Sequence, residues 1–120
     1  MHATALIIAV LASVAIVVLG ARFLVTPARA TTDFGVAADD LRALTAIKGV
    51  RDITSGVVVL TVWAAAGTSA MGWALVAAAL TPVGDGLIVT TRSGRLGTAL
   101  GVHGLTALVL VAVGLVLAAG

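Results

Sequence analysis

Three ionisable side chains, Asp52, Asp85 and His103, lie inside long apolar stretches of the chain. A charged group at the centre of a bilayer costs at least about 2.5–3.5 kcal/mol, so such groups are expected to face protein and to have partners. Two carboxylates and an imidazole suit acid–base chemistry, because one group can donate a proton while another accepts one or activates water. We therefore take Asp52, Asp85 and His103 as candidate catalytic residues.

Other polar side chains share helix faces with these three. Lys48, Arg51 and Asp52 stand at i, i+3 and i+4, which is one face of a helix. Asp85 follows Pro82 in the motif TPVGDG, and a proline in a helix leaves the carbonyl four residues earlier without its bond. An arginine beside the carboxylates would orient an acid or an oxygen anion. The candidate ligand-binding residues are Arg22, Lys48, Arg51, Ser55 and Thr81.

Apolar stretches long enough to cross a membrane must position these residues. The chain has 120 residues, of which 61% are hydrophobic and 10% charged, whereas soluble domains are about 25% charged. A helix needs about 20 residues to cross the hydrocarbon core. The sequence predicts an all-α integral membrane four-helix bundle with antiparallel up-down topology. It would form one domain, 1–120, with spans at about 3–26, 41–66, 69–91 and 96–119 and a long cytoplasmic loop at 27–40.

The positive charges predict how these spans are oriented. All 7 Lys and Arg residues fall at the end of the first span, at the start of the second, or around the turn at 91–95. Cytoplasmic loops of membrane proteins are enriched in Lys and Arg. We expect a multi-pass protein of the bacterial cytoplasmic membrane with its basic loops inside and both termini outside. The helical rise then puts Asp52, Asp85 and His103 roughly 16, 9 and 10 Å from their helix ends.

Composition also narrows the range of sites and partners. There is no cysteine, so no thiol nucleophile or Cys-based metal site can form. One deep histidine and two aspartates on separate helices are a thin ligand set, so no metal and no cofactor is predicted. The net charge is +2, which gives no basic patch for nucleic acid. Gly97, Gly101 and Gly104 would permit close helix contact, within the monomer or in a homo-oligomer.

Several stretches carry a resemblance to a known family. They are ARFLVTP (21–27), FGV (34–36), KGVRDITSG (48–56), PVGDGLIV (82–89) and GVHGLTA (101–107). Together they resemble a bacterial and fungal family of small four-helix membrane proteins, domain of unknown function 4267. The resemblance covers nearly the whole chain and implies the same architecture and the same polar residues. It implies no particular reaction.

Three functions fit these observations. In the first, a polar pocket near the cytoplasmic side binds an amphiphilic or lipophilic small molecule, with isomerase, cyclase or epoxide-opening chemistry as one form of it. In the second, the protein is an accessory or structural membrane subunit whose buried ion pairs fix helix packing. In the third, it is a small proton-linked transporter, although the outer half of the predicted bundle carries no ionisable relay. Membrane lipids are expected partners in all three.

Overall fold

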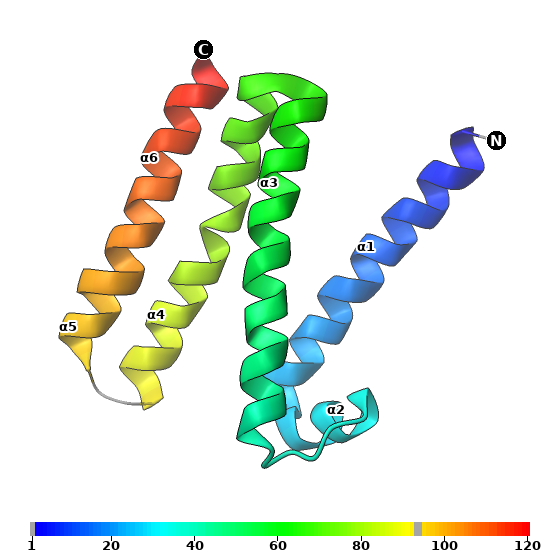
Figure 1. Ribbon diagram of the computed structural model, residues 1–120, viewed down its shortest axis with the longest axis vertical. Coiled ribbons are helices and arrows are strands. Elements are labelled where there is room, and N and C mark those ends of the chain that lie inside the picture. The colour runs from blue at the N-terminus through cyan, green and yellow to red at the C-terminus, as the bar shows by residue number, and fades with distance from the viewer. Residues whose placement is uncertain (1, 93–94) are drawn as a thin grey trace. The chain divides into compact units, whose positions relative to one another are not determined.

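The structure, a computed structural model, describes residues 2–92 and 95–120. Within these ranges the chain is helical and contains no strand, which confirms the predicted all-α class. The chain divides into two compact units, Met1–Gly49 and Val50–Gly120, where the sequence predicts one domain. In chain order the elements are α1 (His2–Val25), α2 (Pro27–Phe34), α3 (Leu41–Ala78), α4 (Leu80–Arg92), α5 (Leu96–Thr98), the π-helix η1 (Ala99–Gly104) and α6 (Leu105–Ala119) (Figure 1).

The segment that follows α1 differs from the sequence prediction. Residues 27–40 were expected to form a loop, but Pro27–Phe34 form the two-turn helix α2. Proline is well suited to the first turn of a helix, because its missing N–H would have no partner there. Gly35 ends α2 with a left-handed φ of 102°, and its N–H donates to the Thr32 carbonyl at 3.0 Å. The prediction treated Pro27 as the end of one helix and so missed the start of the next.

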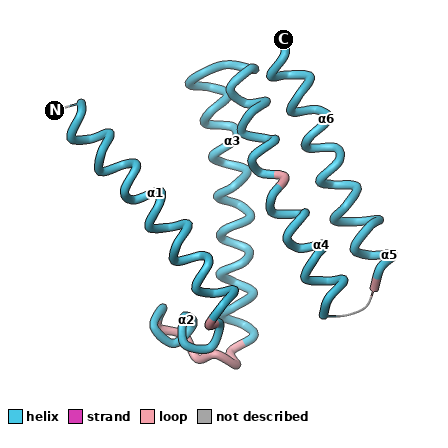
Figure 2. Tube along the Cα trace, turned by 180° about the vertical axis from the view of Figure 1, so that it is seen from behind, coloured by secondary structure: helices cyan, strands magenta, loops and turns pink. Residues whose placement is uncertain are grey.

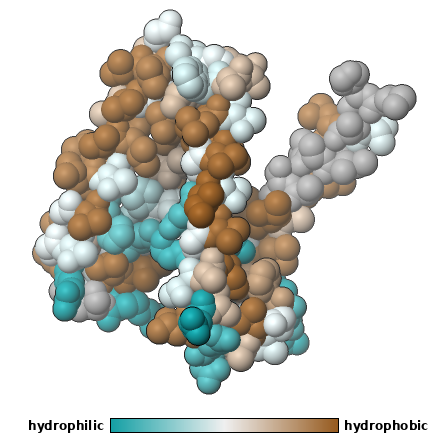
Figure 3. All heavy atoms as spheres, in the orientation of Figure 1, coloured by the Kyte–Doolittle hydropathy of each residue, from teal (hydrophilic) through white to brown (hydrophobic). Residues whose placement is uncertain are grey.

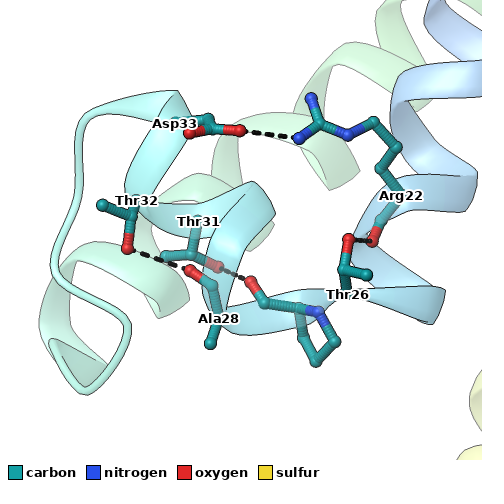
Figure 4. Close-up of polar contacts among 7 residues, drawn as sticks. Arg22, Thr26, Ala28, Thr31, Thr32 and Asp33 are labelled. Atoms are coloured by element: carbon teal, nitrogen blue, oxygen red, sulfur yellow. Dashed lines mark hydrogen bonds and ion pairs between the residues drawn. The ribbon is translucent and has the colours of Figure 1, made fainter.

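Two side-chain pairs on consecutive residues join α1 to α2. The Arg22 guanidinium donates to the Asp33 carboxylate at 2.6 Å, as Figure 4 shows. The rings of Phe23 and Phe34 meet edge to face, with their centroids 6.2 Å apart. The Thr26 hydroxyl donates to the Arg22 carbonyl at the corner between the helices, at 3.2 Å (Figure 4). The first unit is thus a corner held by one ion pair and one aromatic pair.

Helix α3 contains the second predicted span and the start of the third. Asp40 directly precedes it and is its N-cap, because its carboxylate accepts from the Ala43 N–H at 3.0 Å. At Gly67 the backbone leaves helical geometry, with φ 84° and ψ −176°. Figure 1 shows that the chain doubles back within α3. The interruption divides α3 into arms at 41–66 and 68–78.

A second interruption separates α3 from α4. Ala79 is outside both helices, although the Val83 N–H still donates to the Ala79 carbonyl at 3.2 Å. Figure 2 shows this position as a short break between two helices. Pro82 is buried three residues later, and its ring nitrogen has no hydrogen to give the Ala78 carbonyl. The predicted third span, 69–91, is therefore a broken helix made of the second α3 arm and α4.

The broken helix packs against α6 through glycine. A β-carbon on Gly72 would lie 2.5 Å from the Gly114 carbonyl oxygen, so the two backbones are in direct contact. Nearby, the Ser69 hydroxyl donates to the Ala118 carbonyl at 3.1 Å. Early residues of one segment thus meet late residues of the other, and 68–92 and 96–119 run in opposite directions.

Within the monomer, no neighbouring helix approaches closely at Gly97, Gly101 or Gly104, the positions at which the sequence predicts close contact. A β-carbon on Gly97 or Gly101 would meet nothing within 4 Å. A β-carbon on Gly104 would meet only its own helical segment, 3.4 Å from the Ala99 carbonyl oxygen. The helix contact falls instead at Gly72 and Gly114, where the sequence carries no GxxxG spacing. The predicted use of the three glycines in a homo-oligomer stays a prediction.

The surface of both units is strongly apolar. Many large aliphatic side chains are more than half exposed, including Val17 at 72%, Ile53 at 70% and Val116 at 72%. Figure 3 shows apolar surface over α6 towards the C-terminus and more polar surface nearer α5. Two helical stretches, Leu41–Arg92 and Leu96–Ala119, have the length and composition of membrane-spanning helices.

Hydroxyl side chains on these helices bond to their own backbone. The Thr54 hydroxyl donates to the Val50 carbonyl at 2.8 Å, and the Thr61 hydroxyl donates to the Val57 carbonyl at 2.8 Å. Ser55 does the same towards the Arg51 carbonyl at 3.0 Å. In lipid no water is present to satisfy a polar group, so this pattern lets an exposed hydroxyl remain in an apolar surface.

Candidate functional site

Helix α4 presents Asp85 on its more buried face. Pro82 is buried, and Asp85, Gly86 and Val89 are partly buried. The other residues from 87 to the end of α4 are exposed. Pro82, Asp85 and Val89 stand at i, i+3 and i+7, which is one face of a helix. Asp85 is therefore held half-buried on the packed face of a helix that begins at a break.

His103 belongs to the facing segment, which is also irregular. It is half-buried in η1, and Ala99 and Ala107 on the same side of this segment are buried. A π-helix is rare, and single π turns inside α-helices are frequently found at functional sites. The sequence reasoning placed His103 on a regular helix and missed the π turn, because no residue type specifies one.

Glycine brings the two segments together at this point. A β-carbon on Gly86 would lie 3.3 Å from the His103 β-carbon and 3.5 Å from the Ala99 carbonyl oxygen. A β-carbon at 86 would require the neighbouring η1 atoms to move by a few tenths of an ångström. Gly86 of α4 thus faces His103 of η1, and Asp85 is the residue directly before Gly86 in the chain.

Several hydrogen-bond acceptors lie near this contact. A carboxylate, when ionised, only accepts hydrogen bonds. The Thr106 hydroxyl, one turn from His103, donates to the Val102 carbonyl at 2.6 Å, and the Thr90 hydroxyl donates to the Gly86 carbonyl at 2.8 Å. Because Pro82 carries no N–H, the Ala78 carbonyl lacks the bond that a regular helix would supply.

The other predicted site residues are not drawn into this contact. Arg51, Asp52 and Ser55 are exposed along the first arm of α3, and Thr81 is exposed at the start of α4. Lys48 lies in the first unit. In the part of the chain that the structure describes, no group of three or more His, Cys, Asp or Glu side chains could hold a metal ion.

Arg22 has a defined partner that the sequence reasoning did not consider. It pairs with Asp33 of α2, and the two side chains are 42% and 53% exposed. Asp33 lies in the segment that was expected to be a loop, so no helix face linked it to Arg22. A helix starting at Pro27 would have placed Asp33 and Phe34 at its end, which is the signal that could have found the pair.

Comparisons with known proteins place the chain in a family. No curated protein and no solved structure matches it. A family model does match, over residues 13–117, and its description is domain of unknown function. Since the match covers most of the 120 residues, the chain belongs to that family, DUF4267.

Proposed function

We propose that this chain is a multi-pass protein of the cytoplasmic membrane with four spans. Its basic turns would lie in the cytoplasm and both termini outside. Three features support this: the apolar exposed surface, the hydroxyls that bond to their own helices, and the placement of all 7 basic residues towards one side of the predicted bundle. The broken third span also fits, because a helix break at membrane depth is tolerated where it is covered by protein or lines a cavity.

In this membrane protein, the contact between α4 and η1 is a binding site for the polar end of a lipophilic molecule. The observation that carries this proposal is that half-buried Asp85 directly precedes Gly86, which packs against the half-buried His103 of the π-helix η1. The break at Ala79 lies six residues before Asp85 in the same broken helix.

Acid–base chemistry is a natural extension of binding at this site. A carboxylate and an imidazole with different environments can exchange protons with a bound substrate, as isomerisation, cyclisation and epoxide opening require. Asp52 would join such a reaction only from the first arm of α3, so we assign it second place after Asp85 and His103.

A structural role is the second candidate, and one observation favours it. The Arg22–Asp33 ion pair joins two helices, which is what an accessory subunit with packing ion pairs would use. Under this alternative, Asp85 and His103 would also serve to hold helices together. Ligand binding at α4 and η1 separates the two functions.

The test uses three photoactivatable probes that share a 16-carbon chain with a diazirine and differ in their head: alcohol, carboxylate or quaternary ammonium. The purified protein in detergent is labelled, digested and analysed by mass spectrometry. The proposal expects saturable labelling by at least one probe within 80–92 or 95–106, lost in Asp85→Asn while the variant still folds. Labelling spread evenly over all spans with every probe, or unchanged in Asp85→Asn, contradicts the proposal.

A further inference from the structure

The hydrogen-bonding groups around the site specify the head of the ligand. Resting on the function proposed above, we infer that this site accepts a long-chain alcohol, whose hydroxyl donates to Asp85, and rejects long-chain acids and phosphates.

The site offers hydrogen-bond acceptors to a ligand. The Asp85 carboxylate has about four lone-pair positions. The Ala78 carbonyl, on the same stripe of the broken helix as Pro82 and Asp85, lacks its usual helical bond because of the proline. The nearby hydroxyls of Thr90 and Thr106 already donate hydrogen bonds to the Gly86 and Val102 carbonyls. A ligand that supplies a proton to this group of acceptors would be stabilised.

His103 completes the match to a hydroxyl. A neutral imidazole has one N–H and one bare nitrogen, so it can donate to the oxygen of the same hydroxyl that donates to Asp85. An alcohol is both a donor and an acceptor, and it would use both side chains at once. An ether of the same length offers only the acceptor, so it would lose the bond to Asp85.

A ligand with an anionic head group would be attracted to positive charges away from Asp85. In the second unit, Arg92 is the last residue of α4, Arg95 directly precedes α5, and both are exposed. Arg92 is seven residues beyond Asp85, which is roughly 10 Å along a helix. A carboxylate or phosphate placed beside Asp85 would meet like charge, so it would instead lie at the helix ends with the arginines.

The chain of the ligand would lie along exposed aliphatic side chains on both sides of the site. On α4, Val83 is 47% exposed and Leu87 63%. On η1, Leu100 is 63% and Val102 56% exposed. Val83 and Leu87 lie on either side of Asp85 in the sequence, and Leu100 and Val102 precede His103, so exposed apolar side chains lie near both polar residues. A lipid would approach the site across these side chains from within the bilayer.

The experiment is competition against the diazirine alcohol probe. The competitors are 1-hexadecanol, hexadecanoic acid, hexadecyl phosphate and hexadecyl methyl ether, at equal concentrations with protein in detergent. Hydrogen bonds to charged groups contribute about 1.5–3 kcal/mol, so 1-hexadecanol should compete about tenfold or more better than the ether. Asp85→Asn should reduce labelling by the alcohol about tenfold or more, whereas Asp39→Asn, in the turn before α3, should leave it unchanged.

Two different failures can be told apart. If hexadecanoic acid or hexadecyl phosphate competes as well as 1-hexadecanol, or if the ether does, the inference about the head group is wrong while a lipophile site at α4 and η1 stands. If no probe labels 80–92 or 95–106 saturably, the binding site itself is wrong and the inference falls with it. Unfolding measured by tryptophan fluorescence of Trp63 and Trp73 shows whether each variant is folded.

Discussion

Gly72 and Gly114 lie backbone to backbone, so that neither position has room for a side chain. A β-carbon on Gly72 would be 2.5 Å from the Gly114 carbonyl oxygen, and one on Gly114 would be 2.7 Å from the Gly72 carbonyl oxygen. The obstructing atoms are backbone, which cannot rotate away. Small residues at such contacts let helices approach closely enough for extensive van der Waals packing.

Replacing Gly72 with alanine should therefore destabilise the second unit. Overpacking costs about 1–3 kcal/mol, and the obstruction here is backbone, so we expect the upper part of that range. Gly56→Ala on the same helix is the control, because a β-carbon there meets nothing within 4 Å. Thermal unfolding in detergent should show a lower midpoint for Gly72→Ala and an unchanged or higher one for Gly56→Ala. Equal midpoints for Gly72→Ala and the wild type would contradict the contact.

Gly67 should resist substitution for a different reason. Its φ of 84° and ψ of −176° belong to a region that is essentially confined to glycine, although nothing lies within 4 Å of a β-carbon there. Gly67→Ala should cost about 1–3 kcal/mol through backbone strain alone. The cost can be measured by unfolding the variant beside Thr68→Ala, which keeps the turn geometry and should change the midpoint little.

The Arg22–Asp33 ion pair should contribute little to stability and much to geometry. Both side chains are about half exposed, and exposed pairs contribute about 0.2–1 kcal/mol. Arg22→Ala should therefore lower the unfolding midpoint only slightly. The exchanged variant, Arg22→Asp with Asp33→Arg, should restore the close approach of α1 and α2, measured as the distance between spin labels on the two helices. A large loss of stability in Arg22→Ala would mean that Arg22 has another partner.

The proposed topology can be tested with single cysteines, because the natural chain has none. Thr68→Cys, in the turn between the α3 arms, should react with a membrane-impermeant maleimide on intact bacterial spheroplasts. Ala38→Cys, between α2 and α3, should react only after the membrane is opened. The reverse result would place the basic turns outside, against the charge distribution.

The sequence predicts the helices well and their contacts poorly, for a physical reason. Helix ends follow from local chemistry, as the Asp40 N-cap and the break at Gly67 show. The α1–α2 corner was missed because Pro27 can either end a helix or begin one, and the contacts that favour the second, Arg22 with Asp33 and Phe23 with Phe34, are tertiary. The similar depth of Asp85 and His103 along their helices could be anticipated from the sequence. The π turn that holds His103 against Gly86 could not, because packing determines it rather than residue type.

The tight reversal at Gly67 has a consequence for biogenesis. The interruption at Gly67 is one residue long, so no linker separates the first arm from the helix that is synthesised after it. No charged residue lies between 53 and 84. In the four-span membrane protein proposed above, the two arms of α3, with α4 behind the second, would leave the translocon as a helical hairpin rather than one after the other. Substitutions at this turn would act during synthesis, on whether the hairpin enters the bilayer at all, before they could affect the stability of the finished fold.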